Sequence, residues 1–183
     1  IAPRACGSLS ACLSVMIQKY TPWSLKIAPV EQIRPAKIAA VSRALMIQGT
    51  SSWAGKSLLT TALARLLADR GHDVAPFKGV NMSNNARAVG GGEIGVAQYL
   101  QALAARVEPD VRMNPVLVKP ETHTSSQVVL LGKVDHQLSQ TPWRERAPLL
   151  RAAVDDSLTS LMAEHEVVIA EGAGSPAEIS LSD

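Results

Sequence analysis

The sequence predicts an α/β fold built on a mainly parallel β-sheet, and three observations lead to this prediction. Short apolar runs alternate with helical patterns from Arg43 onward. A glycine-bounded loop joins the first apolar run to the first helical pattern. Polar residues follow the ends of three separate apolar runs, where ligands bind in parallel sheets. We therefore expect a three-layer sandwich of the P-loop type, with helices on both faces of the sheet.

The first predicted strand and helix flank a loop that suits phosphate binding. Residues 44–47 form an apolar run that predicts a strand over 44–48, and residues 56–70 form an amphipathic pattern that Gly71 ends as a C-terminal cap. The loop between them reads Gly-Thr-Ser-Ser-Trp-Ala-Gly-Lys-Ser from 49 to 57. Because backbone N–H groups and a helix N-terminus supply positive potential there, the loop is predicted to bind a nucleoside triphosphate.

Two residues of this loop have predicted chemical roles. Lys56 can reach the β- and γ-phosphates, and the Ser57 hydroxyl can join the ligand shell of Mg²⁺. The common form of the motif has one residue fewer between its glycines, so a simple helix-capping turn remains the alternative. The residues predicted to bind the nucleotide are Gly49, Thr50, Ser51, Ser52, Gly55, Lys56 and Ser57.

The rest of the chain continues the alternation of strands and helices. The polar, glycine-rich stretch from 79 to 92 is predicted to be a loop. Thr141 is the predicted N-cap of the last helix, with Pro142 in its first position. The buried residues predicted for that helix are Leu149, Leu150, Val154, Leu158 and Leu161. The predicted strands are 73–77, 116–118, 128–131 and 167–170, and the predicted helices are 93–106 and 142–165.

Two charged residues directly follow predicted strands and are expected to lie near the phosphate-binding loop. Glu171 follows the run 167–170, where its carboxylate is placed to bind Mg²⁺ beside the phosphates. Lys78 follows the run 73–77, where a cation can neutralise charge on a transferring phosphoryl group. The competing interpretations are a helix-capping or ion-paired glutamate and an ordinary surface lysine.

The predicted loop and the helix after it contain further polar residues. Short amides and hydroxyls in the loop suit either a turn or a polar substrate, and composition alone favours the turn. Glu93 is expected at the start of the helix, where it would complement the helix dipole. Gln98 and Gln101 are expected on the helix surface, and the four histidines show no metal-ligand spacing. The loop residues are Asn81, Ser83, Asn84 and Asn85.

Composition narrows the classes of partner. A net charge of +2 gives no strong case for nucleic acid or an anionic membrane, and 3% aromatic residues are too few for base-stacking platforms. No apolar run approaches the roughly 18 residues of a membrane-spanning helix. Cys6 and Cys12 have no partners at metal-binding spacing and do not indicate a disulfide framework. We therefore expect a cytoplasmic protein that binds neither nucleic acid nor membrane.

The two ends of the chain differ from its middle. Residues 1–43 hold six basic residues, frequent serines and a single acidic residue, Glu31, a composition that resembles a transit peptide. The chain begins with Ile1 rather than Met, so we expect an atypical, disordered extension outside the fold. Residues 44–183 are predicted to form one phosphate-binding domain that is truncated at its C-terminal end.

Six stretches of this chain occur together in a known family. They are Gly49–Ser57, Ala75–Met82, Gly91–Gln98, Met113–Pro120, Ser126–Val129 and Glu171–Glu178. In sequence and order they resemble the N-terminal synthetase domain of the cobyric acid synthases, over about Leu45 to Asp183. The loop spacing is shared with the similar dethiobiotin synthetases. The segments Gly-Gly-Glu-Ile-Gly at 91–95 and Gly-Ser-Pro-Ala-Glu at 174–178 favour the corrinoid enzymes.

The resemblance implies a reaction and roles for named residues. Such enzymes amidate peripheral carboxylates of adenosylcobyric acid a,c-diamide in cobalamin biosynthesis, using ATP, Mg²⁺ and ammonia from glutamine. The carboxylate is phosphorylated, and ammonia then attacks the acyl phosphate. Lys56 and Lys78 would be catalytic by stabilising the phosphates, and Ser57 and Glu171 would hold Mg²⁺. The residues implied on the substrate side are Asn81, Glu93, Gln98 and Gln127.

The chain also departs from the family. The glutamine amidotransferase domain is missing, so ammonia is expected from a separate glutaminase domain, and this chain is expected to use free ammonia or be inactive alone. Trp53 is bulky for the loop tip, where we expect it to be tolerated. Two alternatives remain. One is a dethiobiotin-type ligase, and the other is a partitioning-type switch ATPase, which usually carries a second lysine that Gly49–Ser52 lacks.

Overall fold

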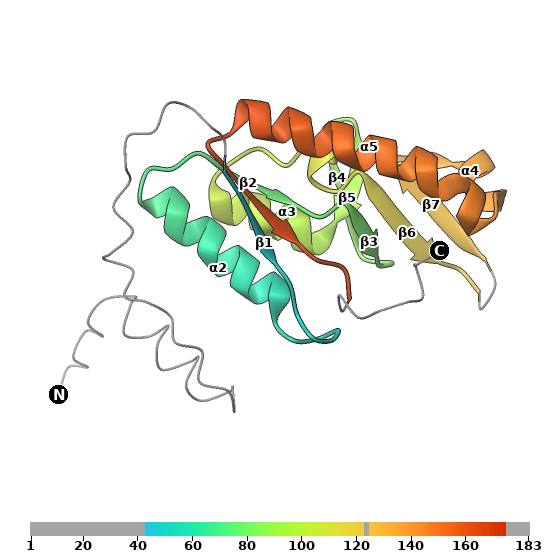
Figure 1. The fold of residues 1–183 in the computed structure, drawn as a ribbon, viewed down its shortest axis with the longest axis horizontal. Coiled ribbons are helices and arrows are strands. Elements are labelled where there is room, and N and C mark those ends of the chain that lie inside the picture. The colour runs from blue at the N-terminus through green and yellow to red at the C-terminus, as the bar shows by residue number, and fades with distance from the viewer. Residues whose placement is uncertain (1–42, 123–124, 175–183) are drawn as a thin grey trace. The chain divides into compact units, whose positions relative to one another are not determined.

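A parallel three-stranded sheet carries the first predicted strand and the last. The computed structural model describes residues 43–122 and 125–174, so the extension predicted at residues 1–43 lies outside it, Arg43 excepted. The last strand in sequence, β9, is the middle strand and pairs in parallel with β1 and β2 (Figure 1). Carboxyl ends from three distant parts of the chain therefore meet. The strands are β1 (Arg43–Ile47), β2 (Val74–Phe77) and β9 (Val167–Glu171).

Helices cover both faces of this sheet, which confirms the predicted three-layer α/β fold (Figure 1). Side chains alternate along β9. Val168 packs with the helix α5 (Trp143–Glu164), and Ile169 packs with the helix α2 (Lys56–Asp69). Fully burying a side chain of this size contributes about 1.5–3 kcal/mol, so β9 anchors both layers.

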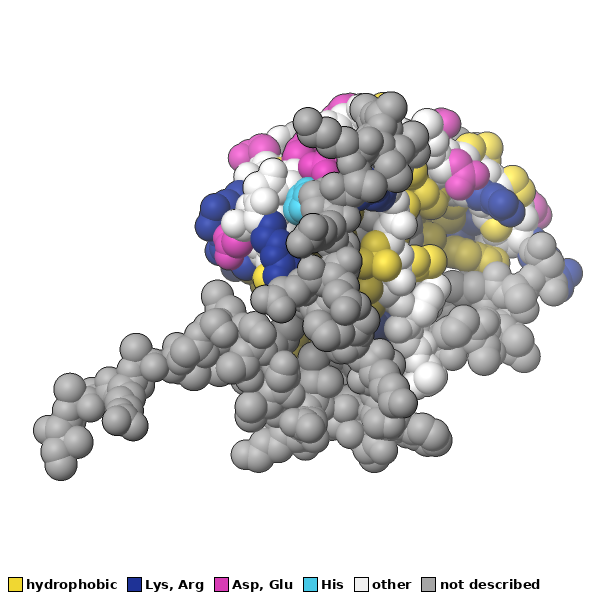
Figure 2. Space-filling model, turned by 60° about the vertical axis from the view of Figure 1, so that its left-hand side comes forward, with side chains coloured by type: hydrophobic (Ala, Val, Ile, Leu, Met, Phe, Trp, Pro, Cys, Tyr) yellow, Lys and Arg dark blue, Asp and Glu magenta, His cyan; other side chains and the backbone are white. Residues whose placement is uncertain are grey.

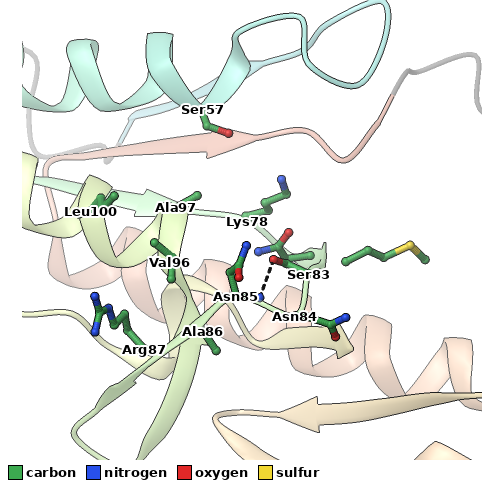
Figure 3. Close-up of a pocket in the computed structure, with 12 residues that line it drawn as sticks. Ser57, Lys78, Ser83, Asn84, Asn85, Ala86, Arg87, Val96, Ala97 and Leu100 are labelled. Atoms are coloured by element: carbon green, nitrogen blue, oxygen red, sulfur yellow. Dashed lines mark hydrogen bonds between the residues drawn. The ribbon is translucent and has the colours of Figure 1, made fainter. Parts of the chain in front are cut away.

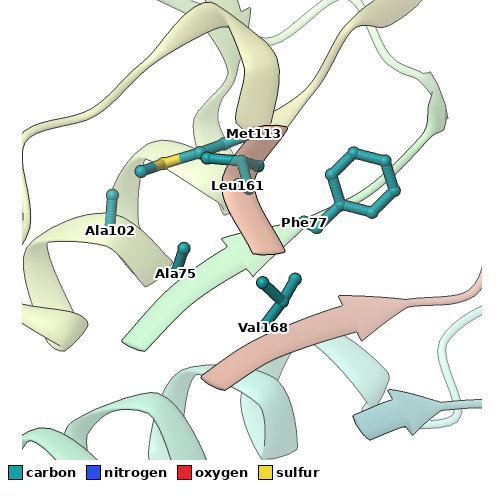
Figure 4. Close-up of a cluster of buried hydrophobic side chains, with 6 residues drawn as sticks. All are labelled: Ala75, Phe77, Ala102, Met113, Leu161 and Val168. Carbon is teal, nitrogen blue, oxygen red and sulfur yellow. The ribbon is translucent and has the colours of Figure 1, made fainter. Parts of the chain in front are cut away.

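The core on the α5 side is built from five elements (Figure 4). Ala102 comes from helix α3 (Val96–Ala105), and its small side chain lets this helix approach the sheet closely. Met113 comes from the short 3₁₀ helix η2 (Val111–Met113). The buried residues of the cluster are Ala75, Phe77, Ala102, Met113, Leu161 and Val168.

A second, mixed sheet extends the fold. Strand β3 pairs in parallel with β6, and β7 and β8 then continue the sheet in antiparallel pairs. Its apolar face packs on α4 (His136–Gln140) and α5 through Leu138 and Leu150. The strands are β3 (Val80–Met82), β6 (Val116–Pro120), β7 (Ser126–Leu130) and β8 (Lys133–Asp135).

The stretch predicted to be a loop at 79–92 contains strands, so that prediction was wrong. Besides β3, it forms β4 (Ala86–Val89), which pairs with β5 (Gly92–Gly95) in an antiparallel hairpin. Helix α3 therefore begins at Val96 and not at Glu93, which lies in β5 opposite Ala88. Backbone pairing decides the structure here, because these strands are short, β5 contains two glycines, and the stretch lacks the apolar alternation that is typical of a strand.

The last helix also starts differently from the prediction. Thr141 closes α4, where its N–H and hydroxyl donate to the carbonyl of Gln137, so it is not the N-cap of α5. Pro142 takes that position, and α5 runs from Trp143 to Glu164. Leu149, predicted to be buried, is 61% exposed, whereas Leu150 beside it is buried.

A cluster of charged side chains ties η2 to α5. Arg112 donates to Asp110 and, across the two elements, to Glu164 at 2.5 and 2.9 Å. The hydrogen bonds from Arg112 lower the pKa of the Asp110 carboxyl and of Glu164, and the same carboxylates raise the pKa of Arg112. The cluster therefore joins η2 to the last residue of α5.

On one face of the molecule, side chains of opposite charge are interspersed around hydrophobic ones (Figure 2). The large hydrophobic side chains that are most exposed among the described residues include Trp53 and Leu58. Within the described region, none of the helices combines the length and apolar character needed to cross a membrane.

Candidate nucleotide-binding site

The loop from Gly49 to Ser57 leads directly from the end of β1 into the first turn of α2. Gly55 is the N-cap, with a left-handed φ of 87° that favours glycine. Among the described residues, no side chain caps this helix start. Its first N–H groups are therefore available to an anion, and a phosphate group fits that arrangement.

The Lys56 side chain folds back over the loop. Its ammonium donates to the Ser51 carbonyl at 2.8 Å, and the residue is 9% exposed. A Cβ at Gly49 would approach the Lys56 side chain to 3.0 Å, so the glycine makes room for the lysine stem. The cation thus lies within the loop that was predicted to hold the phosphates.

Glu171 lies at the point where three segments meet. The sheet register pairs Ile47 with Glu171 and Phe77 with Ala170, which places the residues after β1 and β2 on either side of the carboxylate. The Ser57 hydroxyl donates to Glu171 Oε1 at 2.9 Å, and Lys78 Nζ lies 2.7 Å from the same oxygen. The structure therefore brings Ser57, at the start of α2, together with Lys78 and Glu171, the two residues that were expected near the loop because they follow predicted strands.

Sequence reasoning missed a third partner of this carboxylate. Gln101, expected on the surface of α3, is fully buried, and its Nε2 donates to Glu171 Oε2 at 2.7 Å. Gln98, one turn earlier, is also fully buried, so the surface prediction was wrong for both. One signal was present, because both glutamines share the helical stripe of Ala102 and Ala105 at spacings of three and four.

A cavity of about 740 Å³ lies beside this cluster (Figure 3). Ser57 and Lys78 form part of its wall, β3 contributes Asn81, and the loop after β3 contributes Asn84 and Asn85. Asn81 is buried and donates to Gln98 Oε1 at 3.0 Å. The other lining residues are Met82, Ser83, Ala86, Arg87, Val96, Ala97 and Leu100. A cavity of this size with polar groups on one side suits a ligand.

The predicted substrate residues fall into two groups. Asn81 lines the cavity, with Gln98 directly behind it. Glu93 does not line the cavity; it pairs with Lys119 of β6 at 2.5 Å, and Lys119 stands opposite Gln127 in the β6–β7 register. Glu93 of β5 and Gln127 of β7 are therefore both neighbours of Lys119 and lie outside the cavity lining.

Comparison with known proteins gives this site a context. Residues 45–169 match the family model described as CobQ/CobB/MinD/ParA nucleotide binding domain. A protein of Polaromonas sp. (strain JS666 / ATCC BAA-500) named cobyric acid synthase is 61% identical over 141 residues, 77% of this chain and 28% of the relative.

Two further relatives carry the same name. The protein of Methylibium petroleiphilum is 62% identical over 145 residues, 76% of this chain and 28% of the relative. That of Variovorax paradoxus (strain S110) is 60% identical over 140 residues, 76% of this chain and 29% of the relative. The chain thus spans less than a third of the length of these relatives. Since the family model covers most of its residues, the chain belongs to the CobQ/CobB/MinD/ParA family of nucleotide-binding domains.

Proposed function

We propose that this chain is the ATP-binding synthetase part of a cobyric acid synthase. In this role it amidates peripheral carboxylates of adenosylcobyric acid a,c-diamide in cobalamin biosynthesis, with ammonia supplied from glutamine by a separate glutaminase domain. The relatives named cobyric acid synthase support the substrate. The observation that carries the chemistry is the meeting of Ser57, Lys78 and Glu171 beside a cavity.

The triphosphate of ATP fits the loop Gly49–Ser57. The uncapped start of α2 offers N–H groups and the positive end of the helix dipole to a phosphate. Lys56 lies within the loop, where its ammonium would leave the Ser51 carbonyl to neutralise phosphate charge. Thr50, Ser51 and Ser52 would supply further backbone donors.

Mg²⁺ fits the pair formed by Ser57 and Glu171. Hydroxyl and carboxylate oxygens are ligands that this ion prefers, and the two oxygens lie 2.9 Å apart at the phosphate-binding loop. When held there by Ser57 and Glu171, Mg²⁺ would reduce the negative charge of the phosphates. Lys78 lies on the cavity side of Glu171 and would neutralise the transferring phosphoryl group.

The reaction consists of two displacements. A substrate carboxylate oxygen attacks the γ-phosphorus of ATP, the bond to the β–γ bridging oxygen breaks, and ADP leaves. Ammonia then attacks the acyl carbon and loses a proton, and the carbon–oxygen bond breaks to release phosphate. The first step supplies the leaving group that a carboxylate lacks. The protein mainly positions the reactants and stabilises charge.

The substrate side of the site is also part of this proposal. Asn81 would contact the carboxylate arm of the corrinoid inside the cavity, supported by Gln98. Glu93 and Gln127, which lie outside the cavity, would contact more distant parts of a large substrate. A cytoplasmic location and a domain boundary near residue 43 belong to the same proposal.

Mass spectrometry of the corrinoid tests this function. The 183-residue chain is incubated with adenosylcobyric acid a,c-diamide, ATP, Mg²⁺ and ammonium, and amidation is detected as the exchange of hydroxyl for amino groups. We expect product with the wild type and none with Lys56→Ala. The ATP affinity of this variant should fall about 10- to 100-fold, because it cannot form the charge-assisted hydrogen bond from the ammonium to the phosphates.

Two results would contradict the proposal. ATP hydrolysis without any amidated corrinoid would favour a switch ATPase. Consumption of ATP with a diamino acid and bicarbonate, but not with the corrinoid, would favour a dethiobiotin-type ligase.

A further inference from the structure

We propose that Gln101 is a positioning residue that orients the Glu171 carboxylate toward the phosphate-binding loop. The proposal rests on the function proposed above, because it takes Glu171 to be a ligand of Mg²⁺. Gln101 belongs to α3, outside the nucleotide-binding loop, and it does not line the cavity.

The two oxygens of Glu171 have different partners. Oε1 accepts from Ser57 and Lys78, and both of these residues also line the cavity. Oε2 accepts from Gln101 at 2.7 Å. A ligand in the cavity can therefore draw away the partners of Oε1, whereas the partner of Oε2 stays behind the carboxylate. Oε1 then becomes available to the metal ion, and the hydrogen bond from Gln101 to Oε2 keeps Oε1 directed toward Ser57.

Burial makes this bond hard to replace. Gln101 is 0% exposed, and the Glu171 side chain is 1% exposed. Water has no ready access to Oε2, so removal of the amide would leave a buried carboxylate oxygen without a donor. The carboxylate would then turn toward other donors, and its metal-binding geometry would change.

The orientation of the Gln101 amide supports the same role. Its Oε1 is buried and has no hydrogen-bond partner among the described residues. Reversing the amide would place this oxygen against the carboxylate, so Glu171 fixes the orientation in which Nε2 donates. An apolar side chain of similar volume would fill this space without an unpaired oxygen. The glutamine is therefore explained by its bond to Glu171 and not by packing alone.

The test measures the coupling between Mg²⁺ and ATP binding. Isothermal titration gives the Kd of ATP for the 183-residue chain in Mg²⁺ and in EDTA, for wild type and Gln101→Met. Residues behind a metal ligand typically change metal affinity about 10- to 100-fold. We expect Gln101→Met to weaken Mg²⁺ binding to the ATP complex by that factor while the Kd in EDTA stays unchanged.

Three further variants distinguish a positioning role of Gln101 from a general loss of packing or stability. Glu171→Gln removes the metal ligand itself. The double variant Glu171→Gln/Gln101→Met should therefore bind Mg²⁺ in the ATP complex no more weakly than Glu171→Gln alone. Ser157→Ala removes a buried hydroxyl of α5 that does not line the cavity, and it serves as the control for packing, judged by thermal unfolding and by the same coupling. Gln101→Asn keeps an amide too short to reach Glu171, and it replaces Gln101→Met should that variant not fold.

The outcomes show whether Gln101 positions Glu171 and whether Glu171 binds Mg²⁺. The proposal is supported when Gln101→Met and Glu171→Gln each lose the coupling between Mg²⁺ and ATP binding and the double variant loses no more than Glu171→Gln. Loss in Glu171→Gln with full coupling in Gln101→Met and Gln101→Asn overturns the role of Gln101 and leaves the proposed function standing. Full coupling in Glu171→Gln would show that Glu171 is not a ligand of Mg²⁺, and the proposed role of Gln101 would then be wrong as well.

Discussion

At the scale of single residues, the site depends on which side chains donate hydrogen bonds to the Glu171 carboxylate. Glu171 gathers donors from Ser57, Lys78 and Gln101, and each donor comes from a different element. The position of Ser57 follows from the loop motif and that of Lys78 from a strand end, so both were predictable from the sequence. The third was not predictable, because a glutamine inside an amphipathic helix carries no sign of its partner until the helix is packed.

Gly55 offers a prediction at this scale. A Cβ there would meet no described atom within 4 Å, but φ is 87°, a conformation that costs an alanine about 1–2 kcal/mol. We expect Gly55→Ala to lower the free energy of unfolding in urea by about that amount and to weaken ATP binding. Gly90→Ala is the control, since Gly90 has similar open space without a positive φ. Equal effects of the two variants would show that the strain at Gly55 is unimportant.

At the scale of elements, α3 and η2 connect the site to the rest of the fold. Helix α3 was predicted, but its start was placed three residues early because the hairpin β4–β5 before it was not foreseen. The hairpin depends on backbone pairing between Ala86–Val89 and Gly92–Gly95, and such pairing leaves little trace in composition. Continuous apolar runs such as residues 167–170 of β9 were predictable, since burial on both faces of the sheet requires them.

The charged cluster of η2 and α5 predicts a pH dependence. Hydrogen bonds from Arg112 hold the pKa of Asp110 below its ordinary value of 3.8. A carboxylate with a lowered pKa stabilises the fold above the unfolded value, and this contribution is lost as the pH falls through the folded pKa. We expect Asp110→Asn to lower the free energy of unfolding in urea at about pH 6, and to do so much less at about pH 3.

The exposed pair of Arg151 and Asp155 provides the control for this prediction. Their side chains are 83% and 64% exposed at 3.7 Å, and exposed pairs contribute little. Asp155→Asn should therefore leave the free energy of unfolding nearly unchanged at both pH values. An Asp110→Asn effect of the same size at both pH values would show that the carboxylate acts through packing and not through its charge.

At the scale of the whole molecule, the three layers around the parallel sheet were more predictable from the sequence than the second sheet. The three-layer fold and the strand ends that carry Lys78 and Glu171 were predicted, because alternating apolar runs determine them. The second sheet was only partly predicted: β3, β8 and α4 are short, and their pairing is fixed by the neighbours they meet. The division of the substrate residues into two groups depends on that pairing and was not foreseen.

The chemistry proposed for the whole molecule is the activation of a carboxylate by phosphorylation. The measurement that tests it uses a corrinoid substrate whose peripheral carboxylates carry ¹⁸O, with ATP, Mg²⁺ and ammonium, and analyses the phosphate released. Because the leaving phosphate keeps an oxygen from the carboxylate, we expect one ¹⁸O in inorganic phosphate for each amide formed. Amide formation with unlabelled phosphate would contradict this chemistry.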